Sequence, residues 1–346
     1  MKKVAMIGPG TTSKGGIATV IANFEKTFSK DTVKIHYIAS WREGNSIFRM
    51  LVLMKALFQF CMLLLAKKID IAHIHIAQKG SFYRKVLFMR TAKMFRRKVI
   101  LHMHGSQFDL FYDDRTPKQQ QWIKKQLNHV DELIVLSEEW AKFYKQICKV
   151  KITIVENAVE VPTSNPYTND GKTVVMFGRL GERKGTYDLL KAVELLGEKY
   201  ATYEFVLYGD GDLEQVTQII ETKALSNVKI GGWIEAEQKK AVMDDAIIHV
   251  LPSYHEGLPM AILETMANGI PNISTPVGGI PQVIQHRANS GLVSPGDVEE
   301  LSRELAYLLD NDVARKEQSQ KAYTMIQTKF SIGSYNKKWE SIYKGI

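Results

Sequence analysis

Short apolar, β-branched runs alternate along this chain with longer stretches whose apolar residues recur every three or four positions. A run of the first kind predicts a buried strand, and a stretch of the second kind predicts a helix. Strands are expected at residues 4–7, 35–39, 69–76, 99–103, 132–136, 152–155, 173–177, 205–208, 228–230 and 247–251. Because strands and helices alternate, we expect an α/β fold of parallel, doubly wound sheets.

A stretch of turn-forming residues divides this pattern into two series. Residues 161–171 read VPTSNPYTNDG, a composition typical of a linker. With 346 residues, the chain is long enough for two domains of ordinary size. We therefore expect one domain over residues 1–165, a second over residues 166–330 and a last helix over residues 331–346.

The most hydrophobic stretch covers residues 47–66. Arg49, Lys55 and Gln59 interrupt it, so it falls short of the roughly 20 apolar residues that a membrane-spanning helix needs. We expect a helix that packs on a sheet rather than one that inserts into a membrane.

Composition narrows the class of protein. Hydrophobic residues make up 45% and charged residues 24% of the chain, as in globular proteins. Cys61 and Cys148 have no metal-binding spacing and indicate a reducing compartment. The start, MKKVAMIGPG, lacks the apolar core and cleavage site of a signal peptide. The expected location is the cytoplasm.

Charge is distributed unevenly. Residues 1–151 hold 27 Lys and Arg against 11 Asp and Glu, a balance of +16, whereas the rest of the chain has a balance of −7. Residues 80–98 combine many cations with apolar residues, which predicts a basic amphipathic helix that rests on an anionic membrane. A solvated helix face is the alternative. Nucleic acid is not expected, because no recognised nucleic-acid motif accompanies the charge.

The chemistry concentrates in residues 253–284. A loop with Glu256 and Gly257 leads to Leu258, Pro259 and a helix that carries Glu264. Proline suits a helix start, and the unpaired N–H groups at that start can bind an anion such as phosphate. A second Gly-rich turn, TPVGGI, follows at residues 275–280.

Other candidate residues also follow predicted strands. Residues 178–185 read GRLGERKG and place Arg179 and Lys184 near a helix start, as in a diphosphate site. Gly15 and Gly16 precede the first helix. His104 lies where a strand ends, an edge at which parallel sheets bind ligands. The histidines at 73, 75, 102 and 104 have no carboxylate or cysteine to complete a closed site, so no metal is expected.

The spacing of Glu256 and Glu264, within EGLPMAILETMANGIP and TPVGGIP, resembles the E-x7-E signature of retaining glycosyltransferases with the GT-B fold, of the glycosyltransferase 4 type. The resemblance covers nearly the whole chain, and its specific motifs lie in residues 171–295. It implies two Rossmann-like domains that face a cleft and a C-terminal helix that returns to the N-terminal domain. It also implies transfer of a sugar from a nucleotide diphosphate sugar, most often a UDP-sugar, to a saccharide or lipid-linked acceptor in surface polysaccharide biosynthesis.

The resemblance also implies residue roles. Arg179 and Lys184 would hold the donor diphosphate in place of a metal, with Gly15 and Gly16 facing it. Glu256 would hold donor sugar hydroxyls, Glu264 the ribose, and the turn at Trp233 and Ile234 would meet the base. His104 would contact the donor sugar. No cofactor is implied.

The sequence departs from the family's motifs at two places, and two other functions remain as alternatives. Glu156 and Ala158 replace the proline and glycine of the family's P-N-G-V turn, and Gln282 stands where relatives often have glutamate. A nucleotide-sugar 2-epimerase has the same fold. A non-catalytic nucleotide-sugar-binding protein is the other alternative.

Overall fold

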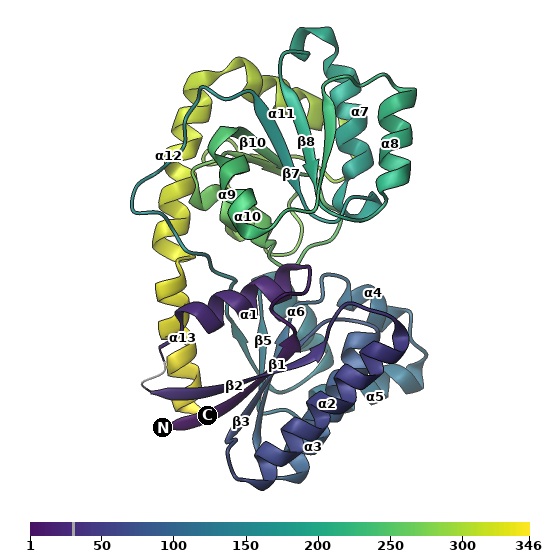
Figure 1. Cartoon of the computed structure of the whole chain (residues 1–346), viewed down its shortest axis with the longest axis vertical. Coiled ribbons are helices and arrows are strands. Elements are labelled where there is room, and N and C mark those ends of the chain that lie inside the picture. The colour runs from purple at the N-terminus through teal and green to yellow at the C-terminus, as the bar shows by residue number, and fades with distance from the viewer. Residues whose placement is uncertain (30–31) are drawn as a thin grey trace. The chain divides into compact units, whose positions relative to one another are not determined.

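The computed structural model describes residues 1–29 and 32–346. The chain forms two compact units, Met1–Asn157 with Ile332–Ile346, and Ala158–Ser331 (Figure 1). Each unit contains one sheet of six parallel strands with helices on its flanks, so the predicted fold class is confirmed. The division falls between Asn157 and Ala158 rather than at residues 165 and 166.

Unit 1 is built on a sheet with the strand order β2-β1-β3-β4-β5-β6. These strands are β1 (Lys2–Pro9), β2 (Val33–Trp41), β3 (Ile71–Ile76), β4 (Lys98–Met103), β5 (Glu132–Val135) and β6 (Lys151–Ile154). Every residue of β3 is buried, His73 and His75 included, since parallel strands are covered on both faces.

Helices cover both faces of this sheet. They are α1 (Gly16–Thr27), α2 (Ser46–Leu65), α3 (Gly80–Met94), α4 (Phe108–Asp113), α5 (Pro117–Leu127), α6 (Glu138–Ile147) and α13 (Ile332–Gly345). Side chains alternate along a strand, so Ala72 and Ile74 join the core cluster that includes residues of α2, α3, α5 and α6. His73 points to the other face, where it stacks on Trp339 of α13.

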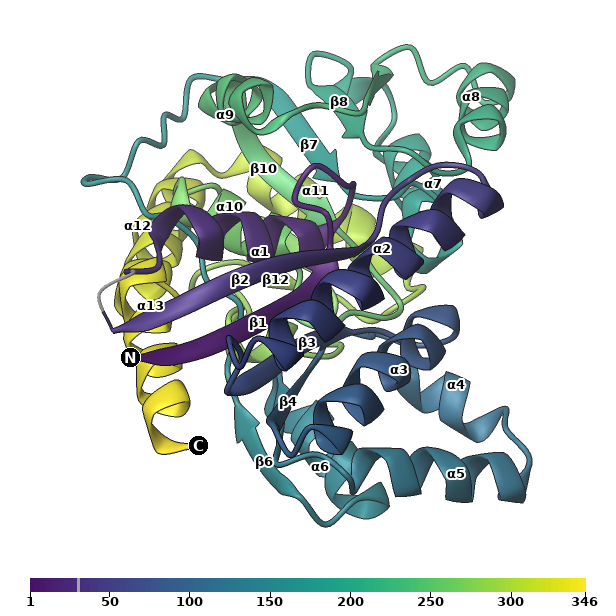
Figure 2. The ribbon, with the colours of Figure 1, turned by 60° about the horizontal axis from the view of Figure 1, so that its bottom comes forward.

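The last helix belongs to unit 1, as the fold-class prediction required. Trp339 and Tyr343 of α13 are fully buried and make edge contacts with Phe24 of α1. Figures 1 and 2 show α13 beside α1, next to the two chain termini. The C-terminal segment therefore completes the core of the N-terminal unit.

Unit 2 repeats this plan with the strand order β12-β11-β10-β7-β8-β9. Its strands are β7 (Thr173–Phe177), β8 (Glu204–Tyr208), β9 (Val228–Gly232), β10 (Ala246–Leu251), β11 (Asn272–Ser274) and β12 (Gly291–Leu292). Its helices are α7 (Thr186–Leu196), α8 (Leu213–Thr222), α9 (Ala236–Asp245), α10 (Met260–Ala267), α11 (Val298–Asp310) and α12 (Asp312–Lys329), with short 3₁₀ turns η1 (Glu182–Lys184), η2 (Glu198–Tyr200) and η3 (Ile280–Gln282).

The hydrophobic stretch at residues 47–66 is α2, one residue displaced from its predicted start. One face packs as expected, with Leu53, Ala56, Phe60 and Leu64 buried. The prediction missed the other face, where Met54 is 60% and Phe58 69% exposed. Among the described residues, α2 is the one helix long and apolar enough to cross a membrane by length and composition.

Candidate functional site

The loops at the carboxyl ends of β7, β8 and β10 form one edge of the unit 2 sheet. The backbone N–H of Leu180 donates to the carbonyl of Asp210 at 2.7 Å, and that of Tyr254 donates to the carbonyl of Arg183 at 2.9 Å. A Cβ on Gly209, whose φ is +152°, would lie 1.7 Å from the Gly178 carbonyl oxygen, so a glycine is needed there. Parallel α/β sheets bind ligands at this edge.

Two predicted site residues meet at this edge. The ammonium of Lys184, at the end of η1, donates to the Glu256 carboxylate in the loop after β10. The Ser253 hydroxyl donates to the same carboxylate oxygen at 2.7 Å. The Glu256 side chain is 6% and the Lys184 side chain 12% exposed, so the pair is largely removed from water.

Burial governs the charge state of Lys184. It lowers the pKa of the ammonium from its ordinary value, Glu256 opposes this shift, and Arg183 adds to it. The Lys184 ammonium can exchange its carboxylate partner for a phosphate, because phosphate oxygens also accept charge-assisted hydrogen bonds. This arrangement suits binding of a diphosphate.

Arg179 lies in the same loop as Lys184 but is exposed. Its Cγ lies 3.1 Å from the position a Cβ on Gly211 would take, so the turn after β8 leaves room for this arginine. Arg183 is engaged elsewhere, because its Nη1 donates to the His255 carbonyl at 3.2 Å. Arg179 is thus the loop arginine whose side chain is most open to solvent.

Helix α10 begins directly after this loop. Pro259 is its N-cap and Met260 its first residue, and no side chain caps that end. The turn that contains Gly278 and Gly279 closes against Gly257, since the Gly279 N–H donates to the Gly257 carbonyl at 2.5 Å. Leu258 is buried beside it. The first N–H groups of α10 therefore lie next to Glu256, where an anion would be stabilised.

Glu264 lies on α10 and is partly exposed. Its side chain is 22% exposed, and its carboxylate accepts from the Lys239 ammonium of α9. Lys239 also lies over the Phe177 ring, 4.5 Å from its centroid. Sequence reasoning missed Lys239, because α9 buries no residue and has no apolar stripe to reveal it.

The turn after β9 carries Trp233 and Ile234. Trp233 is 41% exposed and donates from Nε1 to the Glu235 carboxylate at 3.3 Å, so it is not a core aromatic. Ile234 packs against the small core cluster that contains Val175 and Phe177. The exposed indole leaves a flat aromatic surface near the end of β9, as contact with a planar base would require.

The other predicted residues belong to unit 1. Gly15, with φ +110°, precedes α1, and Gly16 is its first residue; both are exposed. His104 follows β4, and its Nε2 lies 2.9 Å from Nδ1 of His75. Burial lowers the pKa of His104 to about 3, so its imidazole is neutral at neutral pH.

Four histidines of β3, β4 and the loop after β4 stack inside unit 1. His73 contacts the Tyr343 hydroxyl at 2.6 Å through Nδ1 and His102 at 3.3 Å through Nε2. Ligand atoms of His73, His75 and His102 lie within 4.8 Å of one another. Burial lowers the pKa of each. Imidazole is a common metal ligand, so the expectation of no metal stays a prediction.

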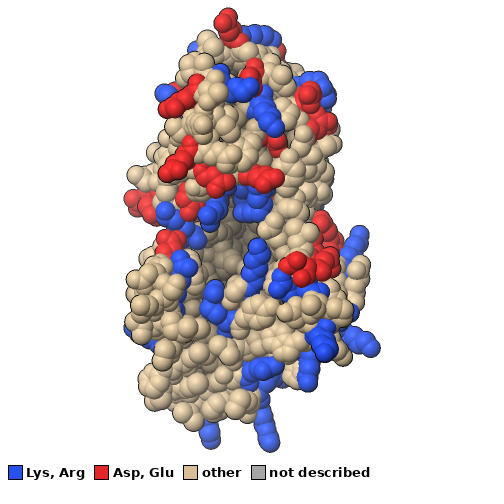
Figure 3. All heavy atoms as spheres, turned by 90° about the vertical axis from the view of Figure 1, so that its right-hand side faces the viewer, with Lys and Arg blue, Asp and Glu red and all other residues tan. Residues whose placement is uncertain are grey.

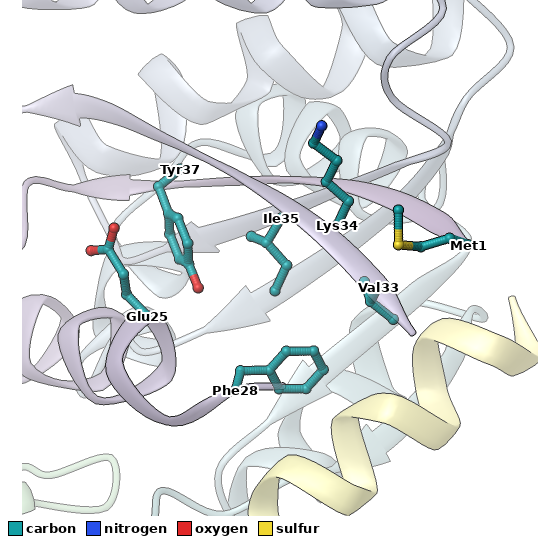
Figure 4. Close-up of a pocket in the computed structure, with 7 residues that line it drawn as sticks. All are labelled: Met1, Glu25, Phe28, Val33, Lys34, Ile35 and Tyr37. Atoms are coloured by element: carbon teal, nitrogen blue, oxygen red, sulfur yellow. The ribbon is translucent and has the colours of Figure 1, made fainter. Parts of the chain in front are cut away.

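A separate hollow of about 400 Å³ opens near the amino end of β2 (Figure 4). Its lining residues are Met1, Glu25, Phe28, Val33, Lys34, Ile35 and Tyr37. None of the predicted site residues lines it, and it lies toward the amino ends of β1 and β2. The hollow is therefore not the candidate site.

Comparison with known proteins relates unit 2 to a described family. Residues 160–325 match the model of the family described as Glycosyl transferases group 1. A similar relative is the amylovoran biosynthesis glycosyltransferase AmsK of Erwinia amylovora, 27% identical over 247 residues. The match covers 67% of this chain and 60% of the relative, so the chain spans about three fifths of that protein.

Two solved structures share the fold. Sucrose-phosphate synthase from Thermosynechococcus elongatus superposes with a TM-score of 0.80 at 15% identity, covering 100% of this chain and 99% of that one. HepE of Anabaena in complex with UDP-glucose gives a TM-score of 0.78 at 16% identity, covering 100% of both chains. At these identities the likeness establishes the GT-B fold alone.

Proposed function

Residues 160–325 form a domain of the glycosyl transferases group 1 family, and we propose that this chain is a retaining glycosyltransferase of surface polysaccharide biosynthesis. It moves a sugar from a nucleotide diphosphate sugar, a UDP-sugar, to a saccharide or lipid-linked acceptor. The observation that carries the proposal is the buried Lys184–Glu256 pair at the start of α10. HepE, which shares the fold, has been solved with UDP-glucose.

The diphosphate is proposed to bind between the loop after β7 and the start of α10. Arg179 and Lys184 then stabilise the charge that grows on the leaving diphosphate, a role that needs no metal ion. The N–H groups at the start of α10 add further donors. When Lys184 turns to the diphosphate, Glu256 keeps its bond from Ser253 and gains acceptor capacity for sugar hydroxyls.

The nucleoside is proposed to lie toward α9 and β9. The Glu264 carboxylate accepts hydrogen bonds from both hydroxyls of the ribose, because an ionised carboxylate offers two acceptor oxygens. Lys239 holds that carboxylate in place from α9. The exposed Trp233 indole and the neighbouring Ile234 meet the base. His104, with Gly15 and Gly16, remains the predicted contribution of unit 1 to donor binding.

The acceptor and location follow from the class of product. A surface polysaccharide is extended on a carrier at the inner face of the plasma membrane, so the enzyme is proposed to work in the cytoplasm against an anionic membrane surface. The basic balance of residues 1–151 supports such a surface as a partner. Lys and Arg predominate over the lower part of the face in Figure 3, which is unit 1.

The test is ligand protection followed by turnover. A nucleoside diphosphate at about 100 times its Kd should add roughly 2.7 kcal/mol to the free energy of unfolding. UDP, GDP and ADP are compared by thermal unfolding, with uridine as the control that lacks a diphosphate. Protection by none of them would reject the proposal.

Turnover separates transfer from epimerisation. The chain is incubated with the protective nucleotide sugar, with and without saccharide acceptors, and the sugar products are resolved. Product that requires an acceptor and keeps the anomeric configuration supports a retaining transferase. A 2-epimer of UDP-GlcNAc formed without any acceptor would replace the proposal with the epimerase, and binding without product would leave a binding protein.

A further inference from the structure

The outer face of α2 carries an apolar stripe that the described residues of unit 1 leave exposed. Six of the exposed apolar side chains of α2 recur every three or four positions, namely Ile47, Leu51, Met54, Phe58, Met62 and Leu65. We call them the α2 stripe. On α3, which packs against α2, Tyr83, Leu87 and Met94 are also exposed. Soluble proteins rarely expose a continuous apolar surface of this extent without a binding partner.

The charge around the stripe restricts what that partner is. The sequence contains no Asp or Glu from Gly44 to Ile69, or from Ile71 to Phe108, so α2 and α3 are free of acidic residues. Exposed Lys55 lies on α2, and exposed Lys67 and Lys68 follow its end, whereas Arg49 of α2 lies over the Trp41 ring of β2. An apolar stripe bordered by cations and lacking anions matches the surface of an anionic bilayer.

The same charge argues against a second copy of this chain as the partner. Two α2 stripes that faced each other would bring the same cations together without any carboxylate from α2 or α3 to offset them. The apolar area would favour such a dimer, but the like charges would oppose it. A bilayer with anionic headgroups satisfies both features at once.

The packing of α2 argues against a membrane-spanning helix. Phe60 and Leu64 are 0% and 1% exposed, and Phe60 lies 5.6 Å from the Phe88 ring of α3. A spanning helix would have to withdraw these side chains from the core of unit 1. The stripe can enter the headgroup region while the inner face stays packed on the sheet.

The cations of α3 are less available than the sequence indicated. Lys93 and Lys98 both bind the Asp131 carboxylate, the latter at 3.2 Å. Arg90 donates to the Gln126 side chain at 2.9 Å and lies over the Trp122 ring. Several cations of residues 80–98 are therefore engaged by partners within unit 1.

We propose that α2 lays this stripe into the anionic phospholipid bilayer, with Lys55, Lys67 and Lys68 on its headgroups. The inference rests on the proposed function in one respect: membrane binding would hold the enzyme beside a lipid-linked acceptor. It makes the stripe, rather than charge alone, responsible for membrane binding.

The test is sedimentation of the full chain with vesicles of phosphatidylglycerol and phosphatidylcholine, or of phosphatidylcholine alone. The double variant Met54→Gln, Phe58→Gln changes two exposed stripe residues. The control, Leu195→Gln with Val313→Gln, changes exposed apolar residues of unit 2, which are 57% and 66% exposed. We expect the wild type and the control to bind anionic vesicles, and the stripe variant to bind at least tenfold more weakly.

Two results would overturn the inference. One is equal binding of the wild type and the stripe variant to anionic vesicles. The other is a wild type that does not bind anionic vesicles and is a dimer by light scattering, while the stripe variant is a monomer. That result would assign the stripe to contact with a second copy of this chain. Thermal protection by UDP, measured on the same samples, reports the proposed function separately, since the stripe and unit 2 are altered independently.

Discussion

Lys184 and Glu256 form an ion pair inside unit 2 although 72 positions separate them in the sequence. The loop after β7 supplies the cation, and the loop after β10 supplies the anion. Because β7 and β10 are parallel neighbours in the sheet, their carboxyl ends meet at one edge. The pair thus ties the proposed diphosphate loop to the start of α10.

The pair should be strongly coupled in stability. Lys184→Gln leaves the Glu256 charge buried without its cation, and we expect a loss of about 3 kcal/mol. Glu256→Gln should cost a similar amount, because it strands the ammonium. The double variant should be more stable than the sum of the two losses predicts. Urea unfolding of the four proteins measures the coupling, and additive losses would contradict it.

Arg179 offers a cleaner test of catalysis, because it is exposed and its removal should not disturb the fold. Arg179→Ala should lower kcat by ~10²–10³, since it removes charge stabilisation that grows as the diphosphate leaves. Arg183→Ala is the matched control from the same loop and should change kcat much less. Steady-state kinetics on both variants decides, and near-normal turnover of Arg179→Ala would remove this residue from the mechanism.

The two carboxylates of the E-x7-E signature should affect the binding of different ligands. Glu264→Ala should weaken binding of the free nucleoside diphosphate and of the intact donor alike, because both contain the ribose. Glu256→Gln, which keeps the side-chain size, should spare the nucleoside diphosphate and weaken the sugar nucleotide. Isothermal titration calorimetry with both ligands measures the split. Equal losses for the nucleoside diphosphate in the two variants would refute separate roles.

Much of the fold could be predicted, because buried parallel strands produce runs of apolar residues that need no tertiary information to detect. The strands that were missed, β11 (Asn272–Ser274) and β12 (Gly291–Leu292), are too short to give such a run. Helix α9 was missed because its residues are mostly polar and none is buried. The fold class therefore survived several missing elements.

The site was less predictable than the fold. Local motifs could identify Arg179, Lys184, Glu256 and Glu264 as candidates, but which cation meets which carboxylate depends on strand order. The partner of Glu264 is Lys239, on a helix without a sequence signal. Likewise, the sequence of α2 could not tell a fully packed helix from one with an exposed stripe, because both have the same composition.

The buried histidines should make the stability of the protein depend on pH. Burial lowers the pKa of His73 to about 3 and that of His102 well below its ordinary value. In the unfolded chain a histidine binds its proton near pH 6.5. The unfolded state therefore binds more protons below that pH, and the free energy of unfolding should fall as the pH drops from about 7 toward 3.

Each such histidine should cost about 2 kcal/mol of stability between pH 7 and pH 5, from a slope of up to ~1.4 kcal/mol per pH unit. His102→Phe removes one of them and should reduce the pH-dependent loss by about that amount. His129→Gln, at an exposed position of unit 1, should leave the loss unchanged. Urea unfolding at pH 7 and pH 5 provides the comparison. If His102→Phe loses as much stability as the wild type over this range, then His102 is not buried in its neutral form.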